Sequence, residues 1–184
     1  MRKVTFGGGC SLDGFLARAD GGLDWLMWSD EVTELMADFW PRIDTIVMGR
    51  KTYTAATETS SDEVKEAAEA NPYTGLKTYI FSRTLEPGVR PSGEEILADD
   101  PGEFVRDLKQ QDGKDICIMG GGDLAKTLLE AGVIDEIGFN IHPILLGSGV
   151  PAFHEMSRSI DLELVECKPL KNGCVYVLYT VKNQ

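Results

Sequence analysis

One segment of the sequence has the features of a phosphate-binding turn. Gly120-Gly121-Gly122 follows an apolar strand pattern over 115–119 and precedes an apolar helical pattern. Glycines between a strand and a helix leave backbone N–H groups uncovered at the positive end of the helix dipole. The amides of the turn, and of Asp123 and Leu124 after it, would then bind a pyrophosphate without a charged side chain. A tight turn selected for its geometry alone is the alternative interpretation.

Two further strand ends carry cations and hydroxyl groups. Gly49-Arg50-Lys51-Thr52 follows a short apolar strand over 44–48, and Ser82-Arg83-Thr84 follows a strand over 77–81. Arginine offers phosphate a planar fork of donors, and serine and threonine add hydroxyl donors. Taken alone, the first segment is better explained as the solvated basic turn of a helix. In a chain of net charge −12, three phosphate-compatible strand ends are a more specific signal.

The charge balance restricts the class of partner. A net charge of −12 repels nucleic acid and anionic lipid, so we expect a small-molecule partner and neither nucleic acid nor membrane. No run of residues approaches the roughly 20 apolar residues of a membrane-spanning helix, and no signal-peptide pattern is present. We therefore expect a cytoplasmic protein. Two histidines and four cysteines without a C-x-x-C pair give no zinc pattern, so we expect no metal.

The order of elements predicts the fold class. Strands over 3–10, 44–48, 77–81 and 115–119 alternate with helices over 30–40, from 50, from 101 and from 122, after which strand patterns alone remain. Ser29 or Asp30 can cap the first helix, and Asn172-Gly173 predicts a closing hairpin. Residues 11–24 are predicted to be a long loop, and 58–71 a surface helix or loop. We predict one α/β domain over 1–184, a three-layer α-β-α fold with a mostly parallel sheet and an antiparallel C-terminal edge hairpin.

Six motifs together resemble the dihydrofolate reductase-like superfamily, and within it the C-terminal reductase domain of the bifunctional riboflavin-biosynthesis deaminase/reductase. They are Ser11-Leu12-Asp13-Gly14, Leu23-Asp24-Trp25, Met48-Gly49-Arg50-Lys51-Thr52-Tyr53, Phe81-Ser82-Arg83-Thr84, Gly120-Gly121-Gly122 and His142-Pro143-Ile144-Leu145-Leu146-Gly147. The resemblance implies NADPH as cofactor and favours a homodimer. It places the pyrophosphate on Gly120–Gly122 and Arg50–Thr52, and the adenosine 2′-phosphate near Ser82 and Arg83.

The resemblance leaves the substrate side more open. Asp30 stands five residues after Trp25, as a substrate-binding carboxylate does in folate reductases, although a helix-capping or first-turn acid is the alternative. Asp13 would border the nicotinamide, although a turn-forming Asp-Gly explains it equally well. Trp25 and Trp28 are candidates for a flat-ring substrate pocket, with core packing the alternative for Trp28. His142 is interpreted as a strand-end residue.

Three functions are compatible with these motifs. The first is an NADPH-dependent reductase that transfers hydride to a C=N or C=O bond of a small cyclic substrate, such as a pterin or pyrimidine. The second is a module that binds NADPH and catalyses nothing. The third is a Rossmann dehydrogenase, because Gly120, Gly122 and Ala125 match G-x-G-x-x-A. A Rossmann fold would need its first strand to lead straight into a glycine turn and helix, so this function ranks last.

Overall fold

The computed structural model describes residues 1–58 and 75–182, with the backbone alone for 56–58. The strands are β1 (Val4–Ser11), β2 (Phe15–Ala17), β3 (Ile43–Gly49), β4 (Lys77–Phe81), β5 (Gly88–Val89), β6 (Glu95–Leu97), β7 (Asp115–Met119), β8 (Glu136–His142), β9 (Val150–Pro151), β10 (Leu162–Pro169) and β11 (Val175–Val181). The helices are α1 (Asp30–Phe39), α2 (Arg50–Glu58), α4 (Pro101–Gln110) and α5 (Gly122–Glu130), with a 3-10 turn η1 (Trp40–Arg42). The surface segment predicted over 58–71 lies outside the described residues, apart from its first residue at the end of α2.

One nine-stranded sheet organises the molecule in the order β10-β11-β8-β1-β7-β3-β4-β6-β5. Strands β8, β1, β7, β3, β4 and β6 run parallel to one another. The β10–β11 hairpin adds to β8 in the antiparallel sense, and β5 is antiparallel to β6 at the other edge. The predicted parallel sheet with an antiparallel C-terminal hairpin is confirmed.

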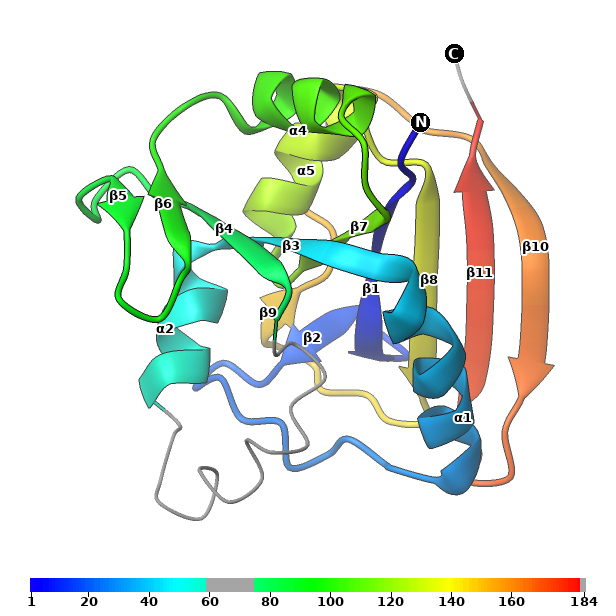
Figure 1. Cartoon of the computed structure of the whole chain (residues 1–184). Helices are drawn as coiled ribbons and strands as arrows, with labels where there is room; N and C mark the ends of the chain where they lie inside the picture. The colour runs from blue at the N-terminus through cyan, green and yellow to red at the C-terminus, as the bar shows by residue number, and fades with distance from the viewer. Residues whose placement is uncertain (59–74, 183–184) are drawn as a thin grey trace.

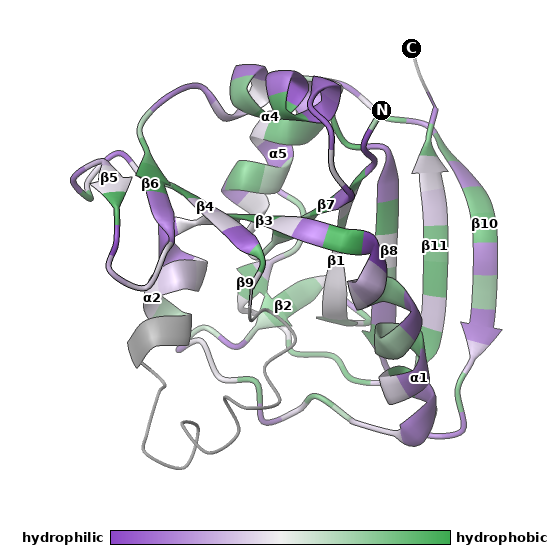
Figure 2. Ribbon diagram, viewed as in Figure 1, coloured by the Kyte–Doolittle hydropathy of each residue, from purple (hydrophilic) through white to green (hydrophobic). Residues whose placement is uncertain are grey.

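Helices cover both faces of this sheet, as Figure 1 shows. Successive strand side chains point to opposite faces, so Val47 joins the cluster that includes Leu128 of α5, whereas Ile46 and Met48 pack with Tyr53 of α2. Helix α4 packs beside α5 on the first face, and α1 packs on the β10–β11 hairpin. Hydrophobic and hydrophilic positions alternate along the helices in Figure 2, as expected when one side faces the sheet. The three-layer prediction is therefore confirmed.

Capping residues set where two of the helices begin. The Ser29 side chain accepts a hydrogen bond from the N–H of Val32, so α1 begins at Asp30. The Asp100 side chain accepts from the N–H of Glu103, and α4 begins at the proline that follows it. Among the described residues, no helix has the length and hydropathy needed to cross a membrane.

One part of the sequence pattern was interpreted too simply. The segment predicted as a loop over 11–24 contains β2, which pairs with β9 in a separate two-stranded sheet. A three-residue strand is too short to show alternation, and its partner lies far along the chain. The closing hairpin turn is formed by Leu170 to Cys174, with Gly173 alone at positive φ (+89°). The hairpin predicted at Asn172-Gly173 is therefore confirmed, with a turn that is longer than two residues.

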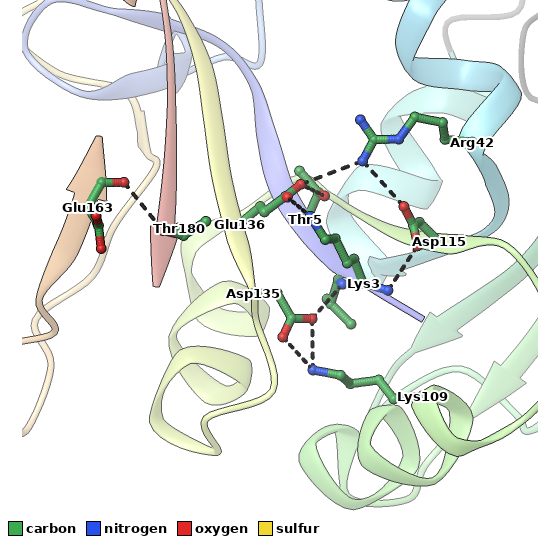
Figure 3. Close-up of polar contacts among 10 residues, drawn as sticks. Lys3, Thr5, Arg42, Lys109, Asp115, Asp135, Glu136, Glu163 and Thr180 are labelled. Atoms are coloured by element: carbon green, nitrogen blue, oxygen red, sulfur yellow. Dashed lines mark hydrogen bonds and ion pairs between the residues drawn. The ribbon is translucent and has the colours of Figure 1, made fainter. Parts of the chain in front are cut away.

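A network of ion pairs joins the amino-terminal ends of the parallel strands (Figure 3). Lys3 and Arg42 contact the buried carboxylate of Glu136 at 2.5 and 3.8 Å. Lys109 of α4 bonds Asp135, whose carboxylate also accepts the backbone N–H of Val4. These contacts fix β1, β8 and α4 to one another at the edge of the sheet opposite the predicted phosphate-binding segments.

Candidate functional site

The three predicted phosphate-binding segments meet at one edge of the sheet. Strands β3, β4 and β7 are parallel, so their carboxyl ends lie together, where open α/β sheets commonly bind ligands. In the strand register, Gly49 is opposite Phe81, and Met48 is opposite Met119. The segments that follow these strands therefore begin side by side, although they are far apart in the sequence.

The glycine turn after β7 packs directly against the first turn of α2. Gly120 has φ +79°, a conformation that residues with a Cβ rarely adopt. A Cβ at this position would overlap the Thr52 hydroxyl oxygen and would lie 2.7 Å from the Thr52 Cβ. The structure thus brings Gly120 and Thr52 together, and the contact requires glycine on both conformational and steric grounds.

The next two glycines leave the beginning of α5 open on one side. Gly121 is the N-cap residue of α5 and makes no side-chain capping bond. A Cβ on Gly121 would meet no atom within 4 Å, so the space above it is free. The first intrahelical bond runs from Ala125 N–H to the Gly121 carbonyl, and the amides of residues 122–124 precede it. This geometry suits an anion at the positive end of the helix dipole.

A residue that the sequence analysis did not assign lies beside this turn. The ring of His154 occupies the position that a Cβ on Gly122 would take, and its Nδ1 is 3.7 Å from the Asp123 carboxylate. Asp123 is exposed, so its side chain faces solvent and its contribution to an anion site is its backbone amide. The Leu124 side chain is buried in the core. No sequence spacing connects His154 with Gly122, because the fold alone juxtaposes them.

Cationic and hydroxyl side chains follow β3 and β4 at the same edge of the sheet as the glycine turn. Arg50 and Lys51 are exposed at the start of α2, and Arg83 is exposed after β4. None of the three forms an ion pair with another residue that the structure describes. Ser82 is buried, and its hydroxyl oxygen accepts the N–H groups of Thr84 and Leu85 at 3.1 and 2.9 Å. Ser82 therefore shapes the turn that presents Arg83 to solvent.

The predicted substrate-side tryptophans have different environments. Trp25 is 6% exposed and its ring meets that of His142 edge to face, with 5.2 Å between centroids. Trp28 is 73% exposed, so the core interpretation of this residue is wrong. Both belong to the segment 25–28, which crosses the carboxyl ends of β1 and β8. An exposed tryptophan beside a buried one offers an apolar surface at that edge.

The Asp13 carboxylate holds two loops together. It accepts the Ser11 hydroxyl at 2.6 Å and the backbone N–H groups of Leu146 and Gly147 at 3.1 and 2.7 Å. The Ser11 hydrogen bond, followed by those two amides, lowers the pKa of Asp13. A carboxylate with a lowered pKa stays ionised near neutral pH. This environment favours a role for Asp13 in positioning the loops rather than in donating a proton.

Asp30 is exposed in the first turn of α1. Ser29 caps that helix, so Asp30 is not its cap. The alternative to a substrate-binding role for Asp30 is therefore that of an acid in the first turn of the helix. Helix α1 packs its apolar side, including Val32, on Leu170 and Cys174 of the hairpin region. Asp30 therefore lies close in the sequence to the Trp25–Trp28 segment, with its side chain open to solvent.

Two cavities lie away from this edge. One, of about 410 Å³, is lined by residues near the chain start, including Arg2 and Lys109. Both cations are already paired, with Asp44 and Asp135 respectively, so they offer no free charge to an anion. The other is small, about 80 Å³, and lies at the end of α5 near Gly132. Within residues 1–58 and 75–182, no group of three or more potential metal-ligating side chains comes together.

Comparison with solved structures defines the fold. A putative riboflavin biosynthesis protein from Shewanella sp. PV-4 superimposes over the whole of both chains with a TM-score of 0.82 at 24% identity. A dihydrofolate reductase from Enterococcus faecalis, solved with NADP(H), gives a TM-score of 0.65 at 16% identity over 98% of this chain and 97% of that one. The fold is therefore dihydrofolate reductase-like, as the sequence motifs predicted.

Comparison of sequences defines the family. The model of the RibD C-terminal domain matches residues 2–176. The uncharacterized protein YyaP from Bacillus subtilis is 30% identical over 182 residues, which cover 97% of this chain and 95% of that protein. The chain belongs to the RibD C-terminal domain family, and the resemblance inferred from the sequence is confirmed.

Proposed function

We propose that this chain is an NADPH-dependent reductase that acts on a C=N or C=O bond of a small cyclic compound of the pterin or pyrimidine type. The observation that carries this proposal is the contact between Gly120 and Thr52. It joins the glycine turn of β7–α5 to the basic first turn of α2 at the carboxyl edge of the sheet. Membership of the RibD C-terminal domain family supports the same class of chemistry.

The residues at this edge fit a pyridine dinucleotide. The open face of Gly121 and the amides at the beginning of α5 would hold the pyrophosphate, with Thr52 on its other side. When bound, NADPH supplies the hydride. The chain's own residues would orient the two reactants, and the Trp25–Trp28 segment would exclude water from one side of the substrate.

The exposed cations favour NADPH over NADH. The additional 2′-phosphate brings up to two negative charges to a protein of net charge −12, so local cations must bind it. Arg83, presented by the Ser82 turn, and Arg50 on the neighbouring strand end are the cations we assign to it. One or two charge-assisted hydrogen bonds of roughly 1.5–3 kcal/mol each correspond to a preference of about ten- to ten-thousand-fold. Both guanidinium groups are exposed, so we expect a value near tenfold.

Fluorescence titration of both nucleotides tests this assignment. Arg83→Ala and Arg50→Ala are expected to weaken NADPH binding about tenfold and NADH binding far less, and high salt should narrow the difference. Arg106→Ala is the matched control, because it removes an exposed guanidinium from α4, where Arg106 donates to the Ala131 carbonyl. Equal affinity of the wild type for the two nucleotides would contradict the assignment.

A turnover assay separates a reductase from a binding module. NADPH oxidation is followed with a panel of pterins, pyrimidines and quinones, with product identified by mass spectrometry. Consumption of NADPH with reduction of a pterin or pyrimidine supports the proposal. Tight NADPH binding with no turnover across the panel would instead favour a module that binds the nucleotide and catalyses nothing.

A further inference from the structure

His142 ends β8 in a buried, uncharged environment. Its side chain is 2% exposed, and it lies beside Ser11 in the register of β8 with β1. Its Nδ1 is 3.2 Å from the backbone nitrogen of Met27 and 3.4 Å from the Cys174 sulfur. Its Nε2 is 3.3 Å from the side-chain amide of Asn140. Four segments that are distant in the sequence therefore meet at one imidazole.

These contacts define the tautomer of His142. The Met27 N–H can only donate, so Nδ1 must be an unprotonated acceptor and the neutral ring carries its proton on Nε2. The Nε2–H then needs an acceptor, and the nearest polar group is the Asn140 amide. Oδ1 of Asn140 is the buried side-chain oxygen that has no partner among the described residues. A half-turn of this amide brings Oδ1 to Nε2–H, since amide orientation is assigned from the hydrogen-bond network.

The same imidazole secures the segment 25–28. Met27 donates its N–H to His142, and its carbonyl accepts the Asn172 side chain at 3.4 Å. Leu26 packs so closely on β1 that a Cβ on Gly9 would lie 2.7 Å from its Cδ2. The Trp25 ring rests edge-on against the His142 ring. The backbone of the segment that carries both candidate substrate-side tryptophans is thus bonded to the end of β8.

A nucleophilic role for Cys174 is the alternative use of this cluster. A thiol, an imidazole and an amide are the groups of some cysteine hydrolases. Cys174 is 1% exposed, however, and burial raises the pKa of its thiol. A buried neutral thiol is neither accessible to substrate nor activated. The cluster is therefore better suited to holding the chain than to attacking a substrate.

We propose that His142 is a positioning residue for the reductase. In its neutral Nε2–H tautomer, His142 holds the segment 25–28, with Trp25 and Trp28, against the carboxyl ends of β1 and β8. The proposal rests on the proposed function for its catalytic consequence, but the contact itself is independent of it. Protonation of Nδ1 would place an N–H against the Met27 N–H, and the segment would lose its anchor.

The surrounding groups keep the imidazole neutral near physiological pH. Burial lowers the pKa of His142. The titratable group that faces it from the hairpin is the Cys174 thiol, which is neutral because burial raises its pKa. In the described structure, the contacts from β1, β8 and segment 25–28 are Gly9, Asn140, Trp25 and Met27, none of which is ionisable. Because the folded pKa lies below the unfolded one, the contribution of His142 to stability is complete above about pH 6.5 and falls as the pH decreases below it.

Nuclear magnetic resonance tests the contact directly. The chain has two histidines, and His154→Gln identifies the resonances of His142. Long-range proton–nitrogen spectra at pH 7.5 should show the Nε2–H tautomer, and an Nδ1–H tautomer would overturn the proposal. The exchange protection of the Met27 amide, corrected for the intrinsic rate at each pH, should fall about tenfold as the His142 ring titrates. Protection of the Met27 amide that does not change as the His142 ring titrates would also overturn the proposal.

Variants separate positioning from simple packing. His142→Asn retains an acceptor for Met27 but cannot become cationic, so its Met27 protection should be high and independent of pH. His142→Leu should lose about tenfold in protection at every pH, and Cys174→Ala should keep the wild-type behaviour.

In turnover, His142→Leu should raise the KM for the substrate found in the panel without changing NADPH affinity, and His142→Asn should restore the wild-type KM. An unchanged KM in His142→Leu overturns the positioning role. If no compound in the panel is reduced, the reductase proposal fails, whereas the tautomer and the exchange data still decide the contact. If His142→Leu does not fold, the tautomer and the wild-type exchange profile decide it.

Discussion

The contact between Gly120 and Thr52 predicts a large difference between two neighbouring glycines. In Gly120→Ala, the alanine backbone would have to keep the left-handed conformation of Gly120, which costs roughly 1–2 kcal/mol, and a new Cβ would be added. It would also lie 2.7 Å from the Thr52 Cβ, where ordinary contacts between carbon atoms are roughly 3.5–4.0 Å. Overpacking of this kind costs about 1–3 kcal/mol, so we expect a total loss of about 2–5 kcal/mol in the free energy of unfolding. Gly121→Ala is the matched control, because its Cβ meets no atom within 4 Å and only the replacement of an N-cap glycine remains, so its change should be about 1 kcal/mol or less.

Urea unfolding of a double-mutant cycle measures the contact itself. Thr52→Gly removes the side chain that the new methyl group would meet, so only the conformational cost at position 120 remains. The coupling between Gly120→Ala and Thr52→Gly should therefore be about 1 kcal/mol or more. If Gly120→Ala is as stable as Gly121→Ala, or if the two changes are additive, the glycine turn and α2 do not form one site.

Three further outcomes follow from the structure. Asp30→Asn should lower turnover more than NADPH affinity if this carboxylate acts on the substrate. Unchanged kinetics with a slightly lower melting temperature would instead make Asp30 a first-turn helix acid. Ser29→Ala, which removes the helix cap, is the control for helix stability. Asp13→Asn should lower the melting temperature at pH 7. The difference in melting temperature from wild type should shrink as the pH falls through the lowered pKa of Asp13, because the carboxylate stabilises the fold only when it is ionised. The family resemblance favours a homodimer, and we assign its interface to the exposed Leu162, Leu164 and Val165 on the edge strand β10. Light scattering should then give the mass of a dimer, and Leu164→Lys should give a monomer. A monomeric wild type would contradict this assignment.

The periodic and capped elements could be predicted from the sequence because their signals are local. The strand Lys77–Phe81 and the start of α4 after Asp100 carry their information in adjacent residues, and both agree with the structure. The phosphate-type strand ends were also recognisable, since strand ends of a parallel sheet share one edge. The strand β2 was missed because its pairing with β9 depends on residues more than a hundred positions away.

The environment of His142 shows what sequence patterns cannot supply. The histidine was interpreted as a strand-end residue, which is correct for its backbone. Its role depends on Met27, Asn140 and Cys174; Asn140 lies two residues away on the same strand, but Met27 and Cys174 reach the ring only through the tertiary fold. His154 at the glycine turn is a second case, because no spacing in the sequence brings it to Gly122. The substrate side of such a site is built mainly from contacts of this kind.

Titration of NADPH into wild-type protein and Gly121→Val tests the central claim most directly. The position has open space for a side chain, so the variant should fold, with a far-ultraviolet spectrum like that of the wild type. We predict that the valine side chain blocks the approach of the pyrophosphate to the beginning of α5 and weakens NADPH binding at least tenfold. A folded Gly121→Val protein that binds NADPH with wild-type affinity would show that the cofactor does not bind at this turn.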